Sequence, residues 1–194
     1  MPRVLPKDFY NRDTEIVARE MLGAVLECRT DDGIASGIIV ETEAYIGEED
    51  PACHAAVGRT RRTEPLYGPP GISYVYFIYG VHWCFNAVTR AAGLPSAVLV
   101  RALEPVAGLE LMRERRGPKI QDVNLTNGPG KLCAALGIDG KLNGLSLQRG
   151  ALVVREGSSV DTRRIVTAKR IGITKAADWP LRYYLRDNPY VSRI

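Results

Sequence analysis

The chain has 194 residues, of which 45% are apolar and 25% charged, an ordinary composition for a globular protein with one buried core. It has no apolar run of the ~20 residues that a membrane span needs and no recognisable secretion signal, so we expect a single domain over residues 1–194, no membrane association and a cytoplasmic location. The 26 basic and 22 acidic residues leave a net charge of +4, which permits a polyanionic partner without establishing one.

The first part of the chain predicts a helix followed by an antiparallel hairpin. Asp13 is a typical N-cap for a short amphipathic helix over residues 14–23. Residues 24–30 and 34–45 are two runs rich in apolar and β-branched side chains. The turn sequence Asp-Asp-Gly at residues 31–33 separates them, so we expect the two runs to pair as a hairpin.

A short helix and a second hairpin are expected next. Asp50, which a proline follows, predicts the N-cap of a short helix that carries His54. Residues 72–89 are rich in aromatic and β-branched side chains and are interrupted only at Gly80. This pattern predicts a hairpin with Tyr79 and Gly80 at its tip.

The rest of the chain shows neither internal repeats nor low-complexity segments. The elements expected there are a strand over 96–105 that ends in Arg101 and Glu104, helices over 106–116 and 130–137, strands over 152–157 and 163–173, and an extended or irregular tail over 181–192. Together the elements predict an α+β fold in one domain, with helices packed on a mixed, largely antiparallel sheet.

Two carboxylates and a phenol share one face of the first hairpin. Period-two alternation places Glu41, Glu43 and Tyr45 on the same side of their strand. A carboxylate such as Glu43 is often no more than a surface or ion-paired group. Here, however, Tyr74 and Tyr76 offer aromatic faces that can hold a flat ring, and an ionised carboxylate can orient and deprotonate a water.

The sequence gives little reason to expect a metal or a cofactor. His54 and His82 lie on different predicted elements, and Glu43 with His54 lacks the His-Glu-x-x-His arrangement of a helical zinc site. The four cysteines have no paired zinc spacing, and we expect them to be reduced. The sequence Asn-Gly-Pro-Gly-Lys at 127–131 lacks the spacing of a nucleotide-binding loop. We therefore expect no metal and no cofactor.

Tyr79 stands out because the tip of a tight hairpin normally carries a small polar residue. A large aromatic side chain buries little of its own surface there. An exposed aromatic ring on a rigid hairpin is suited to enter a partner, as wedge residues enter the base stack of DNA.

Six motifs occur in an order that is typical of one enzyme family: ETEAYIG, ACHAAVGR, YVYFIYGVHWCFN, VLVRALEP, GPGKLCAALGI and PLRYYLR. From Asp8 to Ser192 the chain resembles the alkyladenine type of 3-methyladenine DNA glycosylase. The resemblance implies an enzyme that flips a damaged purine nucleotide out of double-stranded DNA and hydrolyses its N-glycosidic bond. It also implies a compact monomer that acts on the nucleoid without a cofactor.

By motif position, the resemblance assigns the chemistry to two residues. Glu43 is the second glutamate of ETEAYIG and looks like the base that activates the attacking water. Arg101, in VLVRALEP, resembles a residue that helps to hold that water and a nearby phosphate. The motifs contain no lysine placed to attack the sugar, so we expect monofunctional hydrolysis without strand cleavage.

The resemblance places five further residues against the DNA. Tyr45, His54 and Tyr76 look like aromatic walls that stack on the flipped base. Tyr79 looks like the residue that fills the gap left in the helix, at the tip of a protruding, DNA-inserting hairpin. Asn86 resembles the gatekeeper that excludes the amino group of normal guanine.

Arg59, Arg61 and Arg62 are reasonable phosphate contacts, although a solvated basic loop explains them equally well. Two other classes of protein stay open. A non-catalytic nucleic-acid-binding module would use the same aromatic residues and arginines without needing Glu43. A metal-dependent hydrolase would use Glu43 and His54 as ligands, and a chelator would abolish its activity.

Overall fold

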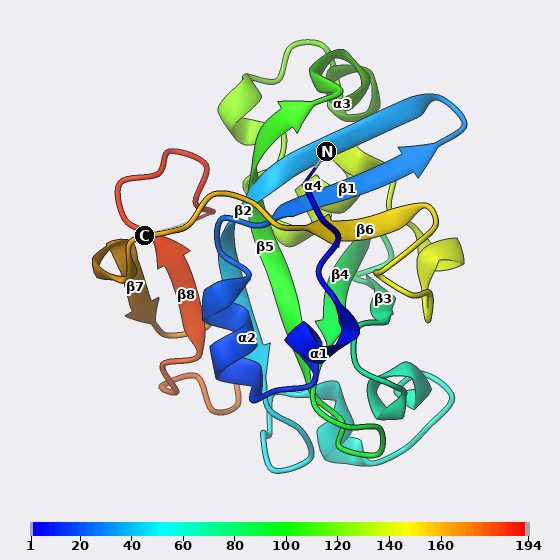
Figure 1. Cartoon of the computed structure of the whole chain (residues 1–194), viewed down its shortest axis with the longest axis vertical. Coiled ribbons are helices and arrows are strands. Elements are labelled where there is room, and N and C mark those ends of the chain that lie inside the picture. The colour runs from blue at the N-terminus through cyan, green and yellow to red at the C-terminus, as the bar shows by residue number, and fades with distance from the viewer. Residues whose placement is uncertain (1, 193–194) are drawn as a thin grey trace.

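An antiparallel sheet runs through the molecule in the computed structural model, which describes residues 2–192 (Figure 1). Within these residues the sheet has eight strands, and each strand pairing is antiparallel. The main path is β3-β4-β5-β2-β1-β6, while β8 pairs with β2 and β7 pairs with β8. The strands are β1 (Val25–Thr30), β2 (Gly33–Tyr45), β3 (Ser73–Ile78), β4 (His82–Val88), β5 (Ala97–Ala107), β6 (Leu152–Arg155), β7 (Ile165–Ala168) and β8 (Arg182–Leu185).

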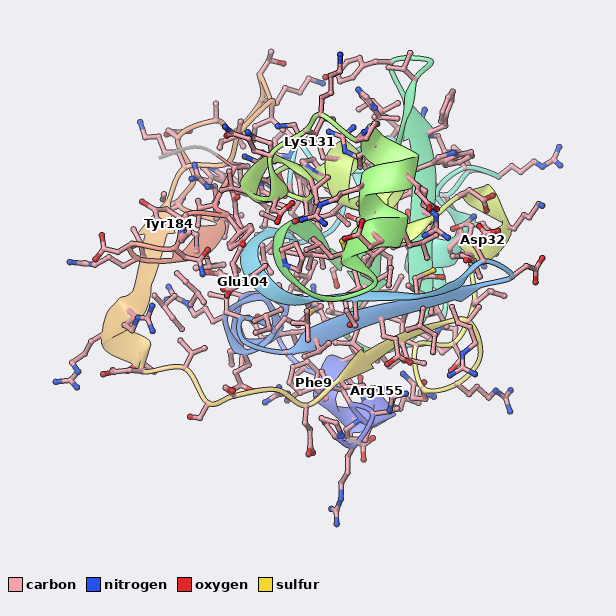
Figure 2. All side chains as sticks on the ribbon, turned by 90° about the horizontal axis from the view of Figure 1, so that it is seen from above. Phe9, Asp32, Glu104, Lys131, Arg155 and Tyr184 are labelled. Atoms are coloured by element: carbon pink, nitrogen blue, oxygen red, sulfur yellow. The ribbon has the colours of Figure 1, made fainter. Side chains whose placement is uncertain are left out.

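Helices cover both faces of this sheet. α2 packs on β2 and β5, and α4 packs on β4, β5 and β2 with α3 beside it. In Figure 1, α1 and α2 lie in front of the sheet, and Figure 2 shows Phe9 of α1 and Lys131 of α4 on opposite sides of it. No helix in the described part of the chain is long and apolar enough to cross a membrane. The helices are α1 (Lys7–Tyr10), α2 (Thr14–Glu20), α3 (Leu109–Arg116) and α4 (Pro129–Leu136), with short 3-10 helices η1 (His54–Val57), η2 (Glu64–Tyr67), η3 (Asp122–Asn124), η4 (Gly140–Leu142) and η5 (Thr162–Arg164).

The predicted α+β class and most of the predicted elements are confirmed. Asp13 caps α2, since its carboxylate accepts the backbone N–H groups of Glu15 and Ile16. β1 and β2 form the first hairpin, in which Val25 lies opposite Ile38. β3 and β4 form the second hairpin, and the turn between them lies where the break in the aromatic run predicts it.

One prediction, at the start of a helix, is wrong. Asp50 does not cap a helix: the single turn η1 begins only at His54, and the Asp50 carboxylate is buried in an ion pair with Arg170. The strand predicted over 96–105 is confirmed as β5, which stays paired with β2 as far as Ala107. Arg101 therefore lies inside the sheet.

β2 positions the site because three strands pair with it along its length. β1 pairs with its first half, β5 with almost all of it, and β8 with the stretch from Glu41 to Glu43. Glu43 lies opposite Leu99 of β5 and Arg182 of β8. The register between β2 and β5 shifts on both sides of Glu41, an irregularity that bends a strand locally. The two glutamates are consequently enclosed by the sheet.

The β3–β4 hairpin ends in a turn over residues 79–81 that presents apolar side chains to solvent. Tyr79 has a φ of 54°, in the left-handed region that a large side chain seldom adopts, and Gly80 follows with a φ of 68°. Tyr79 is 78% exposed and Val81 is 65% exposed. Such a conformation costs free energy, and residues that adopt it cluster at functional sites.

Candidate active site

A cavity of about 290 Å³ opens beside the β3–β4 hairpin. Its walls come from β2, β3, β4 and β5, from η1, from the start of α4 and from residues 171–173. A concave, mainly apolar site with a few polar groups is the usual form of a small-ligand site. The lining includes Tyr45, His54, Tyr74, Tyr76, Tyr79, His82, Cys84, Asn86, Leu99, Arg101, Gly130 and Ile171.

Glu43 is fully buried directly behind this lining. Its Oε1 accepts the backbone N–H of Ile171 at 2.8 Å and lies 3.1 Å from Nη1 of Arg101. Its Oε2 accepts the hydroxyl of Tyr45 at 2.9 Å. An ionised carboxylate has about four acceptor positions, and these donors occupy three, so about one remains for a water.

The surroundings of Glu43 both disfavour and support its charge. Burial raises the pKa of Glu43, while Arg101, the N–H of Ile171 and the hydroxyl of Tyr45 act against the rise. The net result is a carboxyl group whose pKa lies above its ordinary range. A carboxylate of this kind accepts a proton more readily than an exposed one, as general bases do.

Arg101 joins Glu43 to Glu41. Its Nε donates to Oε1 of Glu41 at 3.0 Å, while its Nη1 faces Glu43. Glu41 also lies 3.0 Å from Nε of Arg182 and accepts the backbone N–H of Ser192 at 2.7 Å. Burial alone would lower the pKa of Arg101, but Glu43 and Glu41 raise it, so the guanidinium stays charged. Arg101 lines the cavity, whereas Glu41 is not among the lining residues.

The three predicted wall residues Tyr45, His54 and Tyr76 all line the cavity. The rings of His54 and Tyr76 have centroids 4.5 Å apart at an angle of 68°. Tyr74 joins them, with its hydroxyl 2.8 Å from Nδ1 of His54. Burial, aided by Arg62, lowers the pKa of His54 to about 4, so this imidazole is neutral at physiological pH. The result is a neutral aromatic box suited to a flat, cationic ring.

Asn86 and Tyr79 border the same cavity in different environments. Asn86 is buried, and its side-chain N–H donates to the carbonyl oxygen of Tyr74 at 3.0 Å, which fixes the orientation of the amide. Tyr79 is exposed, so it lies at the mouth. His82 packs there on Gly130, where an added Cβ would come within 2.8 Å of the imidazole.

The three arginines of the predicted phosphate-binding loop are exposed but differ in their contacts. Arg59 makes two hydrogen bonds with Glu64, at 2.8 and 2.6 Å. Arg62 lies 5.6 Å from the ring centroid of Tyr76, at the edge of the cavity. Arg61 makes no hydrogen bond or ion pair with the described residues. The structure thus separates Arg61, which is available to a phosphate, from Arg59, whose charge is already matched.

Across residues 2–192, the histidine, cysteine and acidic side chains form no group of three that could hold a metal ion. His54 is hydrogen-bonded to Tyr74, and Glu43 is held by three donors. All four cysteines are buried free thiols.

Comparison with known proteins identifies the family. The family model for methylpurine-DNA glycosylase (MPG) matches residues 8–189. The chain belongs to the methylpurine-DNA glycosylase family. Three relatives, each named "Putative 3-methyladenine DNA glycosylase", cover 97–98% of this chain and 98–99% of their own length. The identity is 52% with the protein of Desulfitobacterium hafniense, 50% with that of Methanoculleus marisnigri and 48% with that of Carboxydothermus hydrogenoformans.

Membership of the methylpurine-DNA glycosylase family makes the chain a DNA repair enzyme that hydrolyses N-glycosyl bonds. The resemblance drawn from the six motifs is confirmed, and a non-catalytic binding module is excluded. Among the residues around the site, sequence reasoning missed the role of Glu41 and the buried pair of Asp50 and Arg170. Alternation did place Glu41 beside Glu43. No local pattern in the sequence signals the pairing of Asp50 with Arg170, which lie 120 positions apart.

Proposed function

We propose that this methylpurine-DNA glycosylase flips alkylated and deaminated purines out of duplex DNA and hydrolyses their N-glycosidic bond with a water that Glu43 activates. The observation that carries the proposal is the position of Glu43: a buried carboxylate with about one free acceptor position, directly behind an aromatic cavity. The names of the relatives make 3-methyladenine the first lesion to test.

The reaction requires little beyond a correctly positioned water and a negative charge near the sugar. A purine methylated at N3 or N7 carries a positive charge, so it leaves readily as a neutral base with the electron pair of the bond between C1′ and the base nitrogen. A neutral deaminated purine leaves with the same electron pair as an anion, which takes a proton from solvent. A water held by Glu43 and Arg101 then forms the new C1′–O bond, and Glu43 takes the proton that the water loses. The negative carboxylate also stabilises the positive charge that develops on the sugar. No covalent intermediate is required, so the strand stays uncut at an abasic site.

The cavity recognises the base mainly through its faces. Tyr45, His54 and Tyr76 stack on the flipped purine, and a cationic ring gains additional attraction from aromatic faces. Asn86 is held by its hydrogen bond to Tyr74, so it is a rigid group that collides with the amino group of normal guanine.

Flipping depends on the surface around the cavity. Unstacking a nucleotide costs a few kcal/mol, and less for a damaged or mispaired base. Tyr79 offsets this cost by entering the stack in place of the base, which its exposed position at the mouth allows. Arg61 and Arg62 contact phosphates, and Arg59 contributes less because Glu64 already binds its guanidinium. The enzyme acts as a monomer in the cytoplasm, where its substrate is the DNA of the nucleoid.

The test is release of free base from duplexes that each carry one lesion: 3-methyladenine, 7-methylguanine, hypoxanthine or ethenoadenine. A chelator is present throughout, and Glu43→Gln is assayed beside the parent. We expect the parent to release base with the strand intact until hot alkali cleaves the abasic site, and Glu43→Gln to bind DNA without release. Loss of activity with the chelator would indicate a metal-dependent hydrolase, and strand cleavage without alkali would overturn the monofunctional mechanism.

A further inference from the structure

Asp50 and Arg170 form a fully buried ion pair beside the active site. Nη1 of Arg170 donates to Oδ2 of Asp50 at 2.5 Å, and Nη2 donates to Oδ1 at 2.8 Å. Asp50 accepts two further hydrogen bonds, from the backbone N–H groups of Ile46 and Ala52. The pair thereby ties the loop after β2 to the segment that follows β7.

Arg170 also contacts the residues that surround Glu43. Its Nη1 donates to the carbonyl oxygen of Ala44 at 3.0 Å, and its guanidinium lies 4.7 Å from the ring centroid of Tyr45. The next residue along the chain is Ile171, whose N–H donates to Glu43. The side chain of Arg170 thus contacts the cavity wall at Tyr45, and Arg170 comes directly before Ile171, the backbone donor to Glu43. Arg170 does not itself line the cavity.

Stability alone does not account for this arrangement. A buried ion pair seldom stabilises a fold more than apolar side chains of similar volume would. Nε of Arg170 is also buried without a hydrogen-bond partner among the described residues, which costs further free energy. Such costs are common where a side chain is held for function rather than for stability.

We propose that Arg170, held by Asp50, is a positioning residue of the glycosylase reaction: it fixes the Tyr45 ring and the Ile171 N–H, which in turn aim and keep ionised the carboxylate of Glu43. This role rests on the proposed role of Glu43 as the base that activates water. It predicts that changes at Arg170 slow bond cleavage while DNA binding persists.

The proposal includes a pH signature, because Arg170 is one of several charges around Glu43. Removing the Arg170 charge raises the pKa of Glu43, so the acid limb of the rate profile moves to higher pH. A lysine at this position keeps the charge but loses the bidentate pair and the flat contact with Tyr45. The titratable or charged groups around Glu43 are Glu41 and Tyr45 from β2, Tyr76 from β3, Cys84 from β4, Arg101 from β5, Arg182 from β8 and Arg170 itself.

The experiment compares Arg170→Met, Arg170→Lys and Asp50→Asn by single-turnover base release at saturating enzyme, from about pH 5 to 9. We expect Arg170→Met to slow release by about 10- to 100-fold, as a small misplacement of reacting groups does, with its acid limb shifted upward. Arg170→Lys is expected to be slower than the parent with an unshifted limb. The Kd for a lesion duplex is expected to stay within about threefold, as a change confined to the chemical step requires.

Arg155 provides a control for the loss of an arginine that forms a bidentate ion pair, although its pair with Glu27 is partly exposed. It pairs with Glu27 through two hydrogen bonds of 3.0 Å each. It lies on β6 (Figure 2) and is not among the residues that line the cavity. We expect Arg155→Met to lower the melting temperature and to leave the release rate and pH profile at parental values. Arg170 variants that match Arg155→Met in these readouts overturn the positioning role.

Two further outcomes separate this role from the general-base mechanism. If Glu43→Gln keeps the parental rate, the general base is wrong and the positioning role fails with it. If Glu43→Gln is inactive while Arg170→Lys and Arg170→Met both work at the parental rate, only the positioning role fails. Should Arg170→Met not fold, a parental rate for both Arg170→Lys and Asp50→Asn overturns the role equally well.

Discussion

Tyr45 donates its hydroxyl hydrogen to Oε2 of Glu43 at 2.9 Å, from two positions further along the same strand. Burial and the neighbouring Glu43 raise the pKa of Tyr45, so its hydroxyl remains a donor at every pH at which the enzyme works. β2 thereby delivers both the wall of the cavity and the carboxylate behind it. Aromatic contact and proton acceptance are coupled through this one hydrogen bond.

Replacing Tyr45 by phenylalanine separates these two contributions. The ring remains to stack on a base, but Glu43 loses a donor to its ionised form, so its pKa rises. We expect DNA binding near the parental level, base release slowed by about tenfold at neutral pH, and an acid limb at higher pH. Tyr67→Phe is the control, since Tyr67 donates to Glu48 away from the cavity. An unshifted acid limb in the pH–rate profile of Tyr45→Phe would contradict the coupling between Tyr45 and Glu43.

Substitutions of Glu43 and Glu41 are expected to affect different properties, the first excision and the second stability. Glu43→Gln keeps the shape of the side chain but cannot take a proton, so excision falls by several orders of magnitude while folding and DNA binding persist. Glu41→Gln removes a buried charge shared by Arg101 and Arg182, so unfolding in urea should show a loss of about 3–5 kcal/mol. Equal activity loss at equal stability in the two variants would contradict this division.

The sequence predicts those parts of the site whose geometry is set by residues close together along the chain. Alternation along one strand brings Glu43 and Tyr45 together, and the break in the aromatic run places Tyr79 at a turn. Local rules fail at Asp50, where Asp before Pro is typical of a helix start. A guanidinium from a residue 120 positions later binds both carboxylate oxygens and prevails over the cap. The family resemblance supplied roles for single residues but not the ion pairs behind them.

Tyr79→Ala tests whether the ring replaces the flipped base. Base–aromatic stacking contributes about 1–3 kcal/mol, so loss of the ring should lower excision of a well-paired hypoxanthine by about 5- to 150-fold. The same lesion in a small bulge requires little unstacking, and the loss there should be much smaller. Equal losses on the two duplexes would show that Tyr79 supports the hairpin or the pocket instead.

Salt dependence distinguishes the three loop arginines. A side chain that neutralises one phosphate contributes about one unit to the slope of log K against log salt. We expect Arg61→Ala to lower the slope by about one unit on every duplex sequence. Arg59→Ala should lower it less, because Glu64 already binds this guanidinium. An unchanged slope for Arg59, Arg61 and Arg62 variants alike would return the loop to a solvent-facing role.

Protonation of His54 should change the free energy of unfolding at acid pH and should leave the pH dependence of base release near neutral pH unchanged. Burial lowers its pKa to about 4 in the folded chain, against about 6.5 when unfolded. Between these values the unfolded state binds more protons, so stability is present above about pH 6.5 and is lost as pH falls toward 4. Urea unfolding should show a steeper loss for the parent than for His54→Gln over this range. Parallel curves would place the imidazole in solvent.

The hydrogen bond from Ser192 to Glu41 has a consequence for how the enzyme is made. The two residues are 151 positions apart, and β8 also joins β2 only near the end of the chain. At the usual pace of about 5–20 residues per second, a ribosome needs about 8–30 s to travel from one to the other. A nascent chain that has already exposed its glutamates therefore lacks their final partners. The hydrogen-bond set around Glu41 is therefore completed only after residue 192 has been synthesised and β8 has paired with β2.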